Sequence, residues 1–242
     1  MKLRKLIILA VAPMMCLAAS AQDNNPKKGE FTVAATVGYN SYTSVTTSTY
    51  VSSGYTPSSA YSNWNDKQLM VGIEGGWFFH DMWKLTLGGG LSITTKPGYE
   101  ALEGTGYENG DIPTYYAVDN ESRVQYNVYT GVDRYFDFLN VKGLMPYAGV
   151  RFGFAYGRHT VQGEDLYMGK SVAESFNFRG ALTAGVDYFF NSSVFVGIQV
   201  DPFAYTRNRT AMIPQEGLSN TEASANNFSI LAAPTLKVGF KF

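Results

Sequence analysis

Cysteine is almost absent from the 242-residue chain, which contains only Cys16, in a short apolar segment near the N-terminus. Positive residues precede this segment and Ala19-Ser20-Ala21 follows it, a pattern typical of a secretory signal peptide. We therefore expect residues 1–21 to be removed and residues 22–242 to form one domain. That exported domain would have no disulfide, so its stability must come from another source.

Other features are scarce as well. After the N-terminal segment, the chain has no apolar run of the roughly 20 residues that a transmembrane helix requires. The formal net charge is −1, and no basic block indicates binding to nucleic acid. Histidine occurs twice and proline nine times, whereas glycine occurs 25 times and aromatic residues make up 15% of the chain. This balance favours many strands with close backbone approaches over helices.

The C-terminal segment from Phe228 to Phe242 shows the clearest pattern in the chain. An apolar residue occupies every second position, and only Leu231 is out of place. Since side chains alternate between the two faces of a strand, the segment is a strand with one apolar and one polar face. The apolar face comprises Phe228, Ile230, Ala232, Pro234, Leu236, Val238, Phe240 and Phe242. Its length is about twice that of an ordinary strand and suits a tilted crossing of a bilayer.

Seven further segments alternate in the same way. They span residues 31–40, 69–78, 83–94, 123–133, 147–157, 176–188 and 194–201. Eight strands predict an all-β fold, an eight-stranded antiparallel up-and-down transmembrane β-barrel. An even number of strands lets such a sheet close with both termini on one side.

Charge separates the two faces of these strands. The apolar faces carry no charged residue, while the opposite faces carry Glu74, Lys84, Arg123, Asp133, Arg151, Arg179, Asp187, Asp201, Lys237 and Lys241. A basic residue facing lipid near the bilayer midplane costs about 2–4 kcal/mol, so a membrane barrel would exclude it. The alternative is a soluble lipocalin-like barrel that carries an apolar ligand. In such a barrel the apolar faces would point inward and the charged residues would lie outside, in water.

Three features favour the membrane barrel. The polar faces are crowded with small residues, as the interior of a small barrel requires. Aromatic residues cluster at strand ends, where the two interfaces would lie. The connections also alternate between short and long, as periplasmic turns and extracellular loops do.

The export signal, the eight strands, the loop alternation and the terminal Phe242 resemble the OmpA/OmpX-type outer-membrane β-barrel family, and in particular barrels of the Bacteroidetes group. The resemblance covers nearly all of residues 22–242. It implies the cell outer membrane as location, outer-membrane lipid as surroundings and a monomeric state. It also implies that Phe240 and Phe242 form the signal read by the barrel-assembly machinery.

The inward charges are the main candidate site. Eight strands enclose a space that side chains fill, and buried charges must be paired. We expect Arg123, Arg151 and Arg179 to interlock with Glu74, Asp133, Asp187 and Asp201, together with Lys84 and Lys237, as a structural plug. A narrow pore or a small ligand cavity is the alternative.

Catalysis, cofactors and metals are not expected. His80 falls in a short turn, and His159 begins the third long loop; neither has a recognisable nucleophile context. The acidic second loop lacks the spacing of a calcium loop.

The long loops are the best candidates for a specific role. The first, about Thr43 to Asp66, and the second, about Lys96 to Glu121, are rich in Tyr, and the first also in Ser and Thr. Such residues make adaptable contacts on a rigid scaffold. We expect a structural or surface-interaction role, adhesion or ligand binding, without catalysis.

Overall fold

A closed antiparallel barrel forms the body of the protein. The computed structural model describes residues 25–39, 69–105, 115–139, 141–163, 169–191 and 193–242. Its strands are β1 (Phe31–Tyr39), β2 (Leu69–His80), β3 (Trp83–Lys96), β4 (Asn120–Tyr135), β5 (Leu144–Gln162), β6 (Lys170–Phe189), β7 (Val194–Ile213) and β8 (Thr221–Lys241). The expected signal peptide with Cys16, and the first long loop, lie outside the described residues. No helix in the described ranges has the length and apolarity needed to span a membrane.

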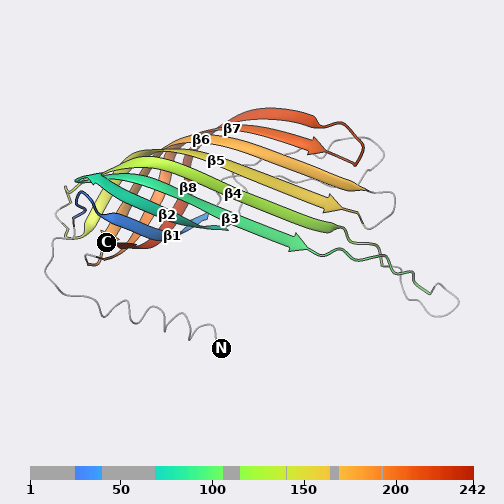
Figure 1. Cartoon of the computed structure of the whole chain (residues 1–242), viewed down its shortest axis with the longest axis horizontal. Coiled ribbons are helices and arrows are strands. Elements are labelled where there is room, and N and C mark those ends of the chain that lie inside the picture. The colour runs from blue at the N-terminus through green and yellow to red at the C-terminus, as the bar shows by residue number, and fades with distance from the viewer. Residues whose placement is uncertain (1–24, 40–68, 106–114, 140, 164–168, 192) are drawn as a thin grey trace.

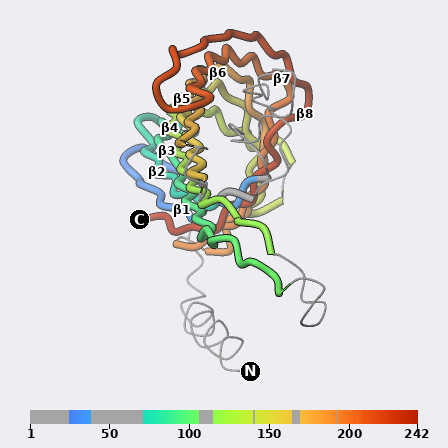
Figure 2. Tube along the Cα trace, turned by 90° about the vertical axis from the view of Figure 1, so that its right-hand side faces the viewer, coloured from blue at the N-terminus to red at the C-terminus, as the bar shows by residue number. Residues whose placement is uncertain are grey.

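Each strand pairs with its sequence neighbours, and β1 closes the ring by pairing with β8 from Thr32↔Lys241 to Gly38↔Thr235. Figure 1 shows the barrel from the side, and Figure 2 shows the strands as a ring. The predicted fold class of eight antiparallel up-and-down strands is confirmed.

The apolar faces of the strands point outward. Val71, Leu87 and Phe152, for example, are each more than 60% exposed. The inward faces bury charged groups such as Glu74, Lys84 and Asp133. An apolar exterior around a charged interior is the arrangement of a membrane barrel, and it contradicts the soluble barrel with an apolar interior.

The short turns lie at one end of the barrel, together with the start of β1 and the end of β8. Met82 supplies the β2–β3 turn with a positive φ of 63°, and Phe190 bonds Val194 across the β6–β7 turn. The C-terminal Phe242 exchanges two backbone hydrogen bonds with Phe31, of 2.7 and 3.0 Å. The final residue of the chain is therefore part of the seam that closes the barrel.

The strands are longer than predicted at the opposite end. The third long loop was expected to begin at His159, but β5 continues to Gln162, and His159 is buried inside the barrel. The strand expected at 176–188 begins at Lys170, the strand expected to end at Asp201 continues to Ile213, and the C-terminal strand begins at Thr221. Polar residues occupy both faces of these extensions, so the alternation that marks a half-buried strand is lost there.

Two adjacent bulges interrupt the wall. Between β6 and β7, the pairs Leu182↔Phe203 and Ala184↔Val200 enclose one extra residue in β7, at Pro202. Between β7 and β8, the pairs Gln199↔Thr235 and Asp201↔Ala232 enclose one extra residue in β8, at Pro234. Proline has no N–H to donate, and within sheets it is confined to edges, strand starts and bulges.

The second bulge explains the one exception in the C-terminal pattern. Leu231 and Ala233 have positive φ values of 53° and 52°. Leu231 and Ile230 both point outward, whereas Ala232 and Ala233 are both buried. The prediction that Ala232 shares the outer face with Phe228 and Ile230 was therefore wrong, and Leu231 marked the bulge.

Candidate functional site in the barrel lumen

A cluster of three cations and three carboxylates fills the lumen. Lys84 on β3 places its Nζ 3.8 Å from Glu74, 3.9 Å from Asp133 and 3.8 Å from Asp187. Lys237 Nζ lies 2.7 Å from Glu74 Oε1, and Arg151 contacts Glu74 at 3.3 Å and Asp133 at 3.4 Å. The positive and negative charges balance, which buried ions require.

Tyrosines surround this cluster and complete its hydrogen bonds. Tyr135 donates to Asp187 at 2.6 Å and Tyr129 donates to Glu74 at 3.0 Å. Lys84 Nζ lies 5.2 Å from the Tyr135 ring and 5.6 Å from the Tyr147 ring, within cation–π range. The sequence placed Tyr129 and Tyr147 on the inner face but did not identify them as partners of the ions. Tyr135 lay beyond the predicted end of its strand.

Glycines make room for the buried charges. Gly149 lies directly opposite Asp133, Gly197 opposite Asp187, and Gly88 opposite Glu74. A Cβ at Gly149 would overlap the carboxylate of Asp133, and one at Gly197 would overlap the carboxylate of Asp187. The small residues of the polar faces are therefore the steric complement of the ions.

An aromatic layer closes the lumen below the ions. Phe78, Tyr135, Met145, Tyr147, Phe189 and Phe195 pack together with Ala34 at the end that carries the short turns. Each of these side chains is at most 2% exposed. At this end, the barrel interior is solid.

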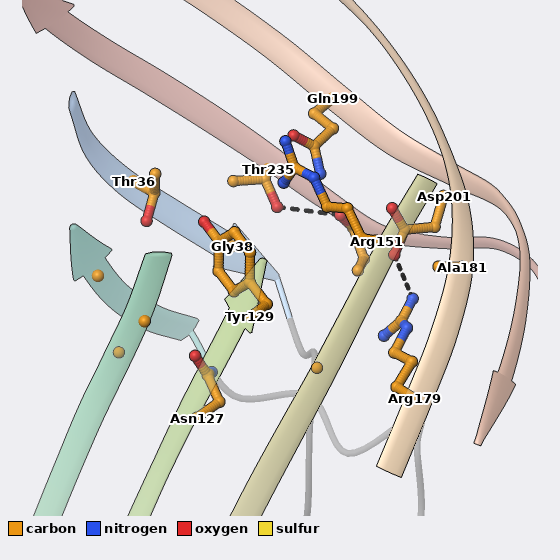
Figure 3. Close-up of a pocket in the computed structure, with 15 residues that line it drawn as sticks. Thr36, Gly38, Asn127, Tyr129, Arg151, Arg179, Ala181, Gln199, Asp201 and Thr235 are labelled. Carbon is orange, nitrogen blue, oxygen red and sulfur yellow. Dashed lines mark hydrogen bonds and ion pairs between the residues drawn. The ribbon is translucent and has the colours of Figure 1, made fainter. Parts of the chain in front are cut away.

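A second ion pair, Arg179 with Asp201, lies further along the lumen, and Thr183 also donates to Asp201 at 3.1 Å. Between this pair and Arg151 is a small cavity, whose lining Figure 3 shows. Its volume is about 50 Å³. A buried water needs roughly 10–15 Å³ of such volume, so the cavity has room for a few waters and for no larger solute.

The structure brings together eight of the nine predicted lumen residues in these two groups. Arg123 lies elsewhere: it lines a recess of about 230 Å³ with Thr94, Lys96 and Glu121 near the other mouth, and it faces His159 across the β4–β5 ladder. Arg123 is thus not part of the predicted network, because it sits too far along β4 to reach the carboxylates. Lys241, the tenth inward charge, pairs with Glu30 at 2.9 Å near the short turns.

The mouth around Arg123 has its own electrostatics. It lies beyond a row of neighbouring, mutually tilted rings, with centroids 5.4 Å apart for Tyr126 and Tyr156 and 5.0 Å apart for Tyr156 and Phe176. Burial and the neighbouring Arg123 lower the pKa of His159 below its usual value. The hydrogen bond from Lys96, at 2.9 Å, lowers the pKa of Glu121.

The other predicted residues have simple surroundings. His80 is exposed, and its Nδ1 lies 3.2 Å from the carbonyl of Asp81. The rings of Phe240 and Phe242 point outward, and Phe242 stacks on Phe31 at 6.4 Å. Within the described residues, no group of three or more His, Cys, Asp or Glu side chains is arranged to hold a metal ion.

Comparison with known proteins agrees with this architecture. A family model described as "Putative OmpA-OmpF-like porin family" matches residues 57–242. No curated protein matches the sequence.

The chain is also similar, at low sequence identity, to several solved structures. Ail, the attachment invasion locus protein of Yersinia pestis, is 12% identical with a TM-score of 0.44, over 89% of this chain and 99% of Ail. The outer-membrane protein OprG from Pseudomonas aeruginosa is 11% identical with a TM-score of 0.47, over 91% of this chain and 99% of OprG. The N-terminal β-barrel domain of OprF from the same species is 16% identical with a TM-score of 0.34, over 90% and 100%.

Proposed function

Because this chain belongs to the OmpA-OmpF-like porin family of outer-membrane barrels, we propose that it is a non-catalytic surface protein with a closed lumen and an extracellular binding surface. The observation that carries this proposal is the extension of the wall beyond the Tyr126–Tyr156–Phe176 row. A tilted strand crosses the bilayer in roughly 9–11 residues. In contrast, β5 to β8 contain 19 to 21 residues each.

The outer face changes character at this aromatic row. Below the row it carries the exposed apolar side chains of the barrel. At the row and beyond it, the outer face carries ion pairs. Arg158 lies 3.7 Å from Glu174, and Arg209 pairs with Glu222. Charged groups are costly on a lipid-facing surface and ordinary in water, so this part of the wall is expected to stand above the membrane.

The β3–β4 connection extends the surface furthest. Its two sides bond to each other at Tyr99↔Val118 and Leu102↔Tyr115, and Figure 1 shows this arm projecting from the barrel. Tyr99, Leu102, Tyr115 and Tyr116 are each more than 60% exposed. Exposed aromatic and apolar groups on a rigid support are typical of a contact surface.

The filled lumen supports the same proposal, because it leaves no open path for a solute. The ion cluster and the aromatic layer fill the cross-section of the barrel, and the cavity beside them has room only for water. Transport of a solute would require the Lys84 and Lys237 ion pairs to separate. The proposed role therefore lies on the surface of the barrel.

A binding experiment on intact cells tests this function. Cells producing the protein would be mixed with molecules extracted from the surfaces of their natural environment. Bound molecules would be fixed to the protein by a chemical cross-linker, and the captured partners would be quantified. Replacing Tyr99, Tyr115 and Tyr116 with Ser is expected to reduce capture several-fold, whereas Arg158→Gln on the wall should leave it unchanged. Equal capture by both variants at equal surface abundance would refute the arm as the binding surface.

A conductance measurement tests the closed lumen. The purified barrel in a planar bilayer should give no steady conductance. A large, steady current would contradict the closed lumen and favour a pore.

A further inference from the structure

An apolar hollow in the outer wall plays no part in the proposed function. It lies over β6, β7, β8 and β1, and its volume is about 690 Å³. Val37, Ala184, Val186, Ile198, Val200 and Leu236 line it, and no charged residue contributes to it. The hollow is thus shaped and lined for an apolar ligand.

The two proline bulges produce this hollow. Leu182 and Phe203 are a bulky, half-exposed pair on the β6–β7 ladder, and the next pair is the smaller Ala184 with Val200. On the other side, Pro234 replaces a ladder residue with one that cannot donate a hydrogen bond. The wall therefore recedes between large side chains. Positive φ values at Leu231 and Ala233 hold the bulge in a conformation that non-glycine residues rarely adopt.

The wall behind the hollow is supported by polar contacts. Gln199 and Thr235 line both this hollow and the lumen cavity, and Figure 3 shows both residues at the cavity. Tyr147 donates to Gln199 at 3.2 Å, and Thr235 donates to the carbonyl of Ala233 at 3.0 Å. The bond from Thr235 satisfies a backbone carbonyl at the interrupted ladder, and the bond from Tyr147 holds the Gln199 side chain on the lumen side of the wall.

We propose that this hollow is a binding site for one acyl chain of a membrane lipid. The hollow is continuous with the membrane-facing surface of the barrel, between the aromatic row at one end and the short turns at the other. Its lining offers dispersion contacts on several sides of a chain, whereas a flat surface would offer them on one side. A lipid held there should exchange more slowly than the lipids around the rest of the barrel.

A matched pair of alanines allows a direct test. Ala184 lines the hollow, and Ala148 is its cross-strand partner on β5, exposed on the same outer face but outside the hollow. Ala184→Phe should fill the hollow, while Ala148→Phe adds the same ring to the outer wall outside the hollow. Both variants would be refolded in detergent containing dipalmitoyl phosphatidylethanolamine, washed with lipid-free detergent and analysed by native mass spectrometry.

The wild-type protein and Ala148→Phe should keep one lipid per barrel, and Ala184→Phe should lose it several-fold more readily. Equal retention by all three proteins would overturn the site, as would a lipid-free dimer that only Ala184→Phe disrupts. A lipid carrying a photoreactive group in its acyl chain gives a second measurement on the wild-type protein. Labelling should concentrate on the peptides containing Val200 and Leu236, and uniform labelling around the barrel would also overturn the site.

Discussion

Lys237 Nζ lies 2.7 Å from Glu74 Oε1, although the two residues are 163 positions apart in the sequence. The bond joins β8 to β2 across β1, which lies between them in the barrel. Glu74 also contacts Lys84 and Arg151. This carboxylate is therefore the common partner of three cations from three other strands. In a barrel without disulfides, these ion pairs link strands that are far apart in the sequence.

Replacing Glu74 should destabilise the barrel strongly. Glu74→Gln would leave the ammonium of Lys237 and the guanidinium of Arg151 without their shared carboxylate in a buried site. Breaking a buried ion pair from one side costs about 3–5 kcal/mol. Urea unfolding in detergent, followed by the gel shift between folded and heated samples, would measure the loss.

The exposed pair of Lys96 and Glu121 provides the control. Lys96 is 67% exposed, and exposed pairs contribute about 0–1 kcal/mol. Lys96→Gln should therefore change the unfolding free energy by less than about 1 kcal/mol. Similar losses in both variants would contradict a special role of the lumen cluster.

The glycines opposite the ions should be intolerant of even one methyl group. Gly149→Ala would place a Cβ against the Asp133 carboxylate and the carbonyl of Val132. Overpacking of this kind costs about 1–3 kcal/mol. Gly180→Ala is the matched control, because the nearest atom to its Cβ would be in the Phe152 ring at an ordinary 3.8 Å. Unfolding experiments on both variants would decide whether the glycines are steric complements or only strand fillers.

The alternation of the sequence predicted the strands best where one face meets lipid and the other meets the lumen. At Val132 and Asp133 these environments differ sharply, so the pattern is clear. At Arg207 and Asn208 both faces are polar, and the pattern that would have extended β7 to Ile213 is absent. The predicted strand ended at Asp201, just before Pro202, whereas in the barrel Pro202 lies at a bulge that the strand passes through.

The charged lumen was only partly predictable for a related reason. The alternation along a strand shows which face a residue occupies. It does not show the height of that residue along the barrel axis, which depends on the stagger between neighbouring strands. Arg123 and Asp133 share the inner face of β4, yet Arg123 lies near the mouth and Asp133 lies in the ion cluster. The partners of a long side chain follow from the register, and a single sequence does not fix the register.

Phe242 should matter for assembly more than for stability. Its ring is 70% exposed and stacks only loosely on Phe31, and exposed substitutions usually change stability by less than about 0.5 kcal/mol. We predict that Phe242→Ala lowers the amount of barrel inserted into the outer membrane several-fold, while the refolded protein keeps its unfolding free energy. Phe152→Ala, at an outward ring that is 65% exposed, should leave insertion unchanged. Normal insertion of Phe242→Ala would refute the assembly-signal role.

Acidification should loosen the mouth of the barrel through His159, which lies beyond the aromatic row and outside the membrane. Burial and the charge of Arg123 lower its pKa in the folded protein below the usual 6.5. The folded state therefore disfavours the proton, so the contribution of His159 to stability is complete above pH 6.5 and is lost as the pH falls toward the folded pKa. His159→Gln should remove this part of the pH dependence, measured as the midpoint of thermal unfolding against pH.

Arg123→Gln tests the cause. Removing the guanidinium should raise the titration midpoint of His159, observed by NMR of the histidine ring, because one of the two groups that disfavour its proton is gone. Arg207→Gln, an exposed residue on the outer face of β7, is the matched control and should leave the midpoint in place. A midpoint that stays fixed in Arg123→Gln would show that the arginine does not contribute, and that burial and the charges of Lys96 and Glu121 set the pKa of His159.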